Sequence, residues 1–220
     1  MKQLLPHSLL PLALLLTACG LGAANPDIPH RNQGLIKPYD GAPPEVELSS
    51  DESAKVHSGQ AIYKQFEYDG GGRAVAVFRV NASAKKVWHV ISDFPKFVGR
   101  VEKVEKAEVY KRDGDKIYVA FTLNLGLFGG TWTYYVEHNY PMDKEGWGTW
   151  KLDYSRSSDL DDSVGFWRVS QISPTESIVT YSVEIRVGGV LGFLRNIIVD
   201  KGLQEATQWV KVYAEKPGRP

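Results

Sequence analysis

The chain has 220 residues, of which 43% are hydrophobic, 11% aromatic and 24% charged, a composition typical of one globular domain rather than a disordered or fibrous chain. Its 26 lysines and arginines balance its 26 acids, so it lacks the broad positive field that attracts nucleic acid. A single cysteine, Cys19, excludes a disulfide within the chain.

Residues 1–19 have the layout of a secretory signal, with Lys2, an apolar stretch over residues 9–16 and small residues after it. The stretch is far shorter than the ~20 residues of a transmembrane helix. Leu16–Cys19 resembles the lipobox of bacterial lipoproteins, in which the signal is cut before the cysteine and that residue is lipidated. The resemblance implies a membrane anchor at Cys19 and, because Gly20 rather than Asp follows, transfer to the outer membrane, facing the periplasm. An ordinary signal cleaved after residues 22–24 is the alternative, and it would release a soluble protein.

Residues 20–57 are rich in proline and glycine, contain an acidic run and show no sustained period of 3.6 or 2. This pattern predicts a flexible tether. The folded domain is expected over residues 58–216.

Within that domain the first predicted strand is Ala74–Val80, and residues 62–68 are a possible strand before it. A short helix over residues 84–93 follows, and Leu194–Glu215 is predicted as a closing helix. Asp113 and Gly114 favour a type I′ hairpin turn. The remaining predicted strands, which bring the antiparallel sheet to about seven, are Val104–Lys111, Lys116–Leu125, Thr131–Asn139, Trp147–Ser155, Val164–Ile172 and Ser177–Val187.

These strands alternate between an apolar, aromatic parity and a polar one, as expected for a sheet covered on one side. Arg168 and Glu184 fall on the polar parity and are expected at the surface. The apolar parity is expected to surround a cavity for a hydrophobic ligand. The predicted ligand-binding residues are Phe78, Phe121, Trp132, Tyr134, Trp150, Tyr154, Trp167, Tyr181, Val183 and Ile198.

Val87–Phe94 in the first helix and Gly165–Val169 in a late strand, together with the order of elements, resemble the START-like (SRPBCC) superfamily, which includes polyketide cyclases, lipid carriers and ubiquinone-binding chaperones. The resemblance implies an α+β helix-grip fold, in which a curved antiparallel sheet wraps around a long C-terminal helix. It also implies binding or transport of a lipid, quinone or polyketide-like molecule. Phe166 departs from the family's pattern, which commonly has a small residue there.

No Ser-His-Asp order, Gly-rich phosphate loop, CxxC pair or HExxH helix is present, so no catalytic residue, metal or cofactor is predicted. One alternative is a cyclase or dehydratase in which His138 acts as a general acid, assisted by Tyr134, Tyr154 or Tyr181. Another is an envelope scaffold whose tryptophans fill the core.

Two glycine-rich segments, residues 125–130 and 188–193, carry large apolar side chains. They are candidate lid loops that contact a membrane through Leu127, Phe128, Leu191 and Phe193. The alternative is that these side chains fold inward and close the end of the sheet.

Overall fold

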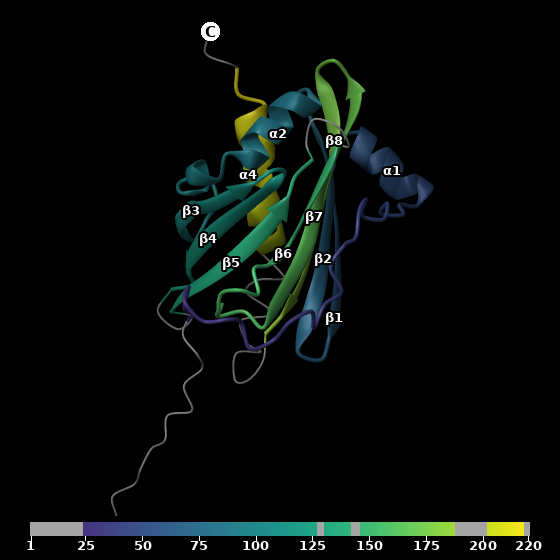
Figure 1. The fold of residues 1–220 in the computed structure, drawn as a ribbon. Helices are drawn as coiled ribbons and strands as arrows, with labels where there is room; N and C mark the ends of the chain where they lie inside the picture. The colour runs from purple at the N-terminus through teal and green to yellow at the C-terminus, as the bar shows by residue number, and fades with distance from the viewer. Residues whose placement is uncertain (1–23, 127–129, 142–145, 188–201, 218–220) are drawn as a thin grey trace, which may run out of the picture.

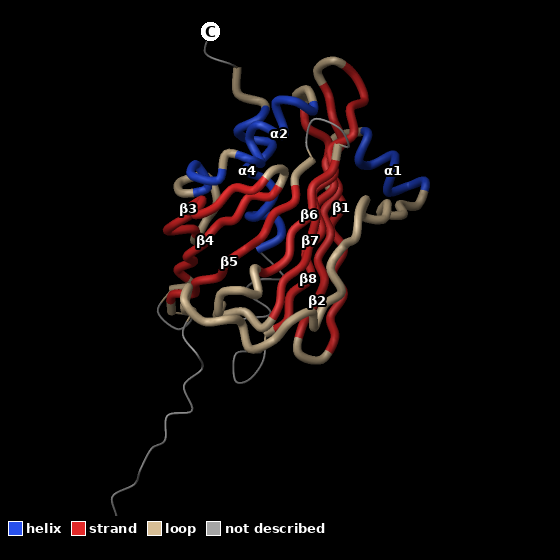
Figure 2. The backbone as a smooth tube through the Cα atoms, viewed as in Figure 1, coloured by secondary structure: helices blue, strands red, loops and turns tan. Residues whose placement is uncertain are grey.

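The computed structural model describes residues 24–126, 130–141, 146–187 and 202–217. Its strands form one antiparallel sheet in the order β1-β2-β8-β7-β6-β5-β4-β3, which curves around the helix α4 (Figures 1 and 2). The strands are β1 Ile62–Tyr68, β2 Gly71–Val80, β3 Val104–Asp113, β4 Lys116–Asn124, β5 Thr131–Asn139, β6 Trp147–Leu152, β7 Asp162–Ser173 and β8 Glu176–Arg186.

The strand predictions are confirmed in place and order, and the sheet has eight strands rather than about seven because residues 62–68 pair with β2. The turn between β3 and β4 differs from the prediction. Asp113 pairs with Lys116, so the two-residue loop is Gly114 and Asp115. Only Gly114 has a positive φ, of 59°, as in a type II′ turn rather than type I′.

Three helical segments pack at the concave side: α2 Ala84–Ser92, the 3₁₀ turn η1 Phe94–Phe97, and α4 Gly202–Ala214. α2 begins at Ala84, as predicted, because the Ser83 hydroxyl accepts the Lys86 N–H, and Pro95 lies in η1 directly after the helix. The predicted helix over residues 194–215 is seen as α4, and residues 194–201 lie outside the described residues. None of the helices in the described ranges is both long and apolar enough to span a bilayer.

The prediction of a flexible tether over residues 20–57 is wrong for residues 24–57. Residues 24–49, here called the N-terminal arm, run along the lower end of the sheet and up its convex face to α1 (Ser50–His57) (Figure 1). α1 begins with a capping box between Ser49 and Glu52. Its buried Val56 packs on Val75 and Val77 of β2. The sheet is therefore covered on both faces.

The arm is held by carboxylates in the connection between β6 and β7 and at the first residue of β7. Asp162, which is fully buried, accepts the Ile36 N–H at 2.8 Å, and Asp161 accepts from the Asn32 side chain at 3.1 Å. Asp159 accepts the Ala24 N–H at 3.0 Å. These bonds join residues more than a hundred positions apart and follow no period, so a periodicity argument cannot detect them.

The arm also explains why some outward-facing side chains of β7 are less exposed than predicted. Tyr39 packs edge-on against Phe166, with ring centroids 5.3 Å apart, and Phe166 is fully buried. Arg168 donates to the Pro43 carbonyl. Glu184 is covered differently, since it accepts from the hydroxyl of Tyr68, the last residue of β1, at 2.7 Å. Arg168 and Glu184 lie on the convex face, as expected, but both are half-buried rather than solvated.

Candidate functional site

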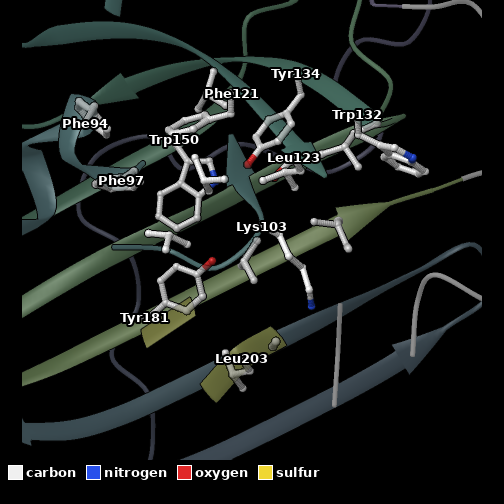
Figure 3. A pocket seen from close by; sticks show the side chains of 18 of the residues that line it. Phe94, Phe97, Lys103, Phe121, Leu123, Trp132, Tyr134, Trp150, Tyr181 and Leu203 are labelled. Carbon is white, nitrogen blue, oxygen red and sulfur yellow. The ribbon is translucent and has the colours of Figure 1, made fainter. Parts of the chain in front are cut away.

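A cavity of about 260 Å³ lies between the concave face of the sheet and the segments η1 and α4 (Figure 3). The volume is far above the roughly 10–15 Å³ that holds one water molecule and just below the roughly 300 Å³ at which ligand pockets usually begin. The concave side is therefore hollow, which contradicts the alternative of a scaffold with a filled core. The aromatic lining consists of Phe94, Phe97, Phe121, Trp132, Tyr134, Tyr140, Trp150, Trp167, Tyr181 and Trp209.

Rings from neighbouring strands stack along the cavity wall. Phe121 of β4 lies opposite Tyr134 of β5 in the sheet register, and their ring centroids are 5.4 Å apart. The ring of Tyr181 on β8 contacts both Trp150 of β6, at 5.6 Å, and Trp167 of β7, at 4.4 Å. Each such pair contributes roughly 0.5–1.5 kcal/mol beyond its buried area. These contacts hold the rings of the cavity wall against one another.

Trp150 lies flat across β7 because its partner in the register, Gly165, has no side chain. A Cβ at Gly165 would lie 2.1 Å from Cζ2 of Trp150 and 2.4 Å from the Ser182 carbonyl oxygen, closer than real contacts allow. A glycine inside a strand commonly marks such a close approach. The absence of a side chain at Gly165 therefore lets the Trp150 ring lie close to β7, and this sets the depth of the cavity.

His138 is buried at the inner end of the cavity among aromatic rings. Its ring centroid lies 4.5 Å from that of Phe94 and 5.0 Å from that of Tyr140. Neither ring nitrogen has a hydrogen-bond partner among the described residues. Burial lowers the pKa of the His138 imidazole to about 3, so the ring is neutral at pH 7. A buried polar group without a partner costs roughly 1–3 kcal/mol.

Tyr134 and Tyr181 direct their hydroxyl groups into the cavity (Figure 3). Burial raises the pKa of the Tyr134 phenol well above its ordinary value. Burial does the same for the pKa of Tyr181, and Coulombic repulsion from Tyr134 adds to the effect. Both phenols remain protonated at neutral pH, so each offers a ligand one hydrogen-bond donor beside an apolar ring.

The two ends of the cavity differ. The inner end is closed by buried rings, where Trp88 of α2 packs edge-on against Tyr140 at 5.8 Å. Among the described residues, the other end is bordered by the buried side chains of Trp132, Leu160 and Ile185 and by Leu125 and the loop that carries Glu102 and Lys103, which are partly or fully exposed. Lys103 has φ of 67°, uncommon for a lysine, and its side chain reaches into this end (Figure 3). We call this end the mouth.

Most of the predicted ligand-binding residues meet at the cavity: Phe121, Trp132, Tyr134, Trp150, Trp167, Tyr181 and Val183 line it. Two predicted residues do not. Phe78 borders a separate hollow of about 160 Å³ beside α4. The Tyr154 ring stacks on His30, with centroids 6.4 Å apart, and its hydroxyl donates to Asp162, so it belongs to the attachment of the arm. Ile198, the lid residues Leu127, Phe128, Leu191 and Phe193, and Cys19 lie outside the described residues.

Several lining residues were not predicted as ligand contacts. Phe94 and Phe97 stand three residues apart on η1, so both rings fall on one side of that turn and face the sheet. Leu203 and Trp209 contribute from α4. A 3.6-residue period in the closing helix identifies an apolar stripe there, but it cannot say which stripe residues border a void.

The fold is similar to that of several solved structures. The STAR-related lipid transfer protein from Xanthomonas axonopodis matches with a TM-score of 0.56 at 14% identity, over 70% of this chain and 99% of that one. The Zhui aromatase/cyclase from Streptomyces sp. R1128 matches with 0.55 at 13%, over 71% and 95%. A START superfamily protein from Mycobacterium smegmatis matches with 0.55 at 13%, over 66% and 97%. Identities this low show the fold alone, which is an α+β fold of the START-like, helix-grip class.

The sequence itself then gives the family. The family model described as polyketide cyclase / dehydrase and lipid transport matches residues 80–208, more than half of the chain. The chain therefore belongs to this family, and the START-like resemblance is confirmed. A comparison with curated proteins found no match.

Family membership and the cavity together support binding of a hydrophobic small molecule or a cyclase-type role. The buried part of the lining supplies apolar walls and neutral hydrogen-bonding groups, and the charged residues Glu102 and Lys103 border the mouth. Among the described residues, no group of three His, Cys, Asp or Glu side chains is placed to hold a metal ion.

Proposed function

We propose that this protein binds and carries an apolar small molecule, of the lipid, quinone or polyketide-like class, in the cavity between the sheet and α4. The observation that carries the proposal is a hollow lined mainly by apolar side chains, aliphatic and aromatic. Each ligand methylene buried there contributes about 0.8 kcal/mol to binding. The hydroxyls of Tyr134 and Tyr181 would orient a carbonyl or hydroxyl on the ligand.

The buried ionisable groups of the lining favour carriage over acid–base catalysis. A general acid or base works best with a pKa near the operating pH. Burial instead lowers the pKa of His138 to about 3 and raises those of Tyr134 and Tyr181. At pH 7 the imidazole has no second proton to give, and the phenols hold theirs firmly.

A cavity-filling variant tests this proposal. A chain that begins at Gly20 would be purified without detergent and extracted with organic solvent, and the extract would be analysed by mass spectrometry. Val183→Phe places a ring in the cavity, whereas Val212→Phe makes the same change at a position of α4 that is 53% exposed. We expect the unaltered chain and Val212→Phe to release an apolar compound and Val183→Phe to release little. Equal amounts from all three, or none from the unaltered chain, would rule the proposal out.

We also propose that lipidated Cys19 attaches the protein to the cell envelope, at the outer membrane facing the periplasm. The lipobox-like Leu16–Cys19 and the absence of any other cysteine in the sequence support this assignment. The hydrogen bond from the Ala24 N–H to Asp159 also supports it, because cleavage after Ala24 would remove that residue.

Mass spectrometry of the amino-terminal peptide of the membrane-extracted protein tests the attachment. An acylated Cys19 is the expected result, and Cys19→Ser should move the protein to the soluble fraction. An unmodified terminus at residues 23–25 would instead establish the ordinary signal.

A further inference from the structure

The position at which the chain enters the fold bears on how the cavity faces a membrane. Ala24 bonds to Asp159, and Asn25 exchanges two backbone hydrogen bonds with Ser157, of 2.8 and 2.9 Å. Asp159 also accepts the N–H of Thr133 at 2.7 Å, and Thr133 lies between two cavity-lining residues at the start of β5. The first described residues are thus fixed beside the cavity wall.

That attachment lies at the mouth end of the sheet. Leu160, next to Asp159 in sequence, lines the cavity, and Asp162 begins β7 at the same end. Figure 1 shows the arm crossing the lower ends of the strands, while α2 covers the upper ends. The inner, closed end of the cavity is therefore the end that lies away from Ala24.

The link between Cys19 and Ala24 is short. Five residue steps separate the two, and an extended chain spans at most about 3.6 Å per residue, or about 18 Å in all. The 12 residues of β7 span about 40 Å at roughly 3.3 Å each, from the mouth end to the α2 end. A free tether over residues 20–57 would have allowed any orientation, but an anchored Cys19 keeps the mouth end nearer the membrane than the α2 end.

Exposed apolar side chains occur at the same end. Ile28 is 50% exposed and stands between Asn25 and His30, both bonded to the β6–β7 connection. Leu35 is 51% exposed and precedes Ile36, which bonds to Asp162. Apolar side chains at an interface gain free energy by entering the boundary between head groups and acyl chains.

From these four observations we infer that the mouth of the cavity faces the lipid surface that holds Cys19, with Ile28 and Leu35 in contact with lipid, so that the apolar ligand enters from the membrane without crossing water. This inference rests on the proposed function, since it requires both the anchor and an apolar ligand. The partner at this surface is a bilayer, and no protein receptor is needed to position the cavity.

The test uses the full chain, extracted from membranes and reconstituted into phosphatidylethanolamine–phosphatidylglycerol liposomes. With Cys19 acylated, an introduced cysteine is the only free thiol. Ile28→Cys and Leu35→Cys would carry a fluorophore at the mouth end, and Ile172→Cys, at a residue 42% exposed near the end of β7, is the matched control at the α2 end. We expect lipids with nitroxide-labelled head groups to quench the first two labels several-fold more than the third.

Equal quenching of the three labels, or stronger quenching of Ile172→Cys, overturns the orientation while the anchor stands. No flotation with liposomes overturns the anchor and, with it, the orientation, whether the chain then carries two labels because Cys19 is unmodified or one label because cleavage has removed Cys19. An insertion of twenty glycine and serine residues after Ala23 is a further check, because the longer link should reduce the difference between the two ends. An unchanged difference would show that the link does not set the orientation.

Discussion

The arm and the cavity bury histidine in opposite ways. In the arm, where it packs on the connection between β6 and β7, His30 is 4% exposed; its Nε2 lies 3.0 Å from the Asp161 carbonyl oxygen, and its Nδ1 accepts the Ser158 N–H at 3.3 Å. On the concave side, His138 is 6% exposed, and neither nitrogen has a partner among the described residues. The chain itself completes the convex face, whereas the concave face keeps space and polar groups for another molecule. The two histidines are buried to nearly the same extent, and they differ in whether the ring nitrogens have hydrogen-bond partners.

The largest expected effect comes from removing a ring on the filled face. Phe166 is fully buried under Tyr39, so Phe166→Ala should lower the free energy of unfolding by about 3–5 kcal/mol, through lost burial and a new cavity. Phe121 already borders a void, so Phe121→Ala should cost about 1–2 kcal/mol less. Urea denaturation measures both. Equal losses would show that the two faces are packed alike.

The next effect comes from the carboxylate that holds the arm. Asp162 accepts hydrogen bonds from the Ile36 N–H, the Ser163 N–H and the Tyr154 hydroxyl, and its removal leaves buried donors unpaired. We expect Asp162→Ala to cost about 2–4 kcal/mol and to expose the arm to protease. Asp115→Ala, at an exposed turn, is the control and should change stability by less than about 0.5 kcal/mol. A protease-resistant arm in Asp162→Ala would contradict the role of this carboxylate.

How much the sequence could predict also differs between the two faces. Alternation places Phe121, Trp132, Tyr134, Trp150 and Tyr181 on one parity, and in the structure these five side chains line the cavity. Period-2 patterning works there because successive side chains of a strand point to opposite faces. The same rule also assigned Phe78, which points to the concave side but lies beyond the cavity, because alternation gives the face and not the position along it.

The arm could not be predicted in this way. Its attachments are single hydrogen bonds, as between Ile36 and Asp162, and ring contacts, as between Tyr39 and Phe166, which leave no period in a sequence rich in proline and glycine. One signal was available. Phe166 is a large apolar residue on the outward parity, which indicates that another segment covers it.

The pH dependence of the free energy of unfolding tests whether His138 is buried without a hydrogen-bond partner. Because the pKa of His138 is about 3 when folded and about 6.5 when unfolded, the unfolded chain binds more protons as the pH falls through this window. The folded state therefore loses stability between pH 7 and pH 5, by about 2 kcal/mol from this group. His138→Phe should lack that contribution, which urea denaturation at the two pH values would detect. The same pH dependence in both proteins would show that His138 is not buried without a partner.

The smallest effect is expected at the edge of the arm. Arg31 pairs with Asp161, but its side chain is 58% exposed, and solvent screens such a pair. Arg31→Ala should change the free energy of unfolding by less than about 1 kcal/mol and leave the arm protected from protease. A larger loss would mean that this ion pair, rather than Asp162 and His30, holds the arm.

The aromatic lining has a practical consequence for spectroscopy. Of the six tryptophans in the chain, four line the cavity, namely Trp132, Trp150, Trp167 and Trp209. Indole emission depends on the polarity around the ring, so these four rings report on the surface that a ligand would cover. Binding of an apolar molecule there is expected to shift the emission wavelength, with no dye and no label.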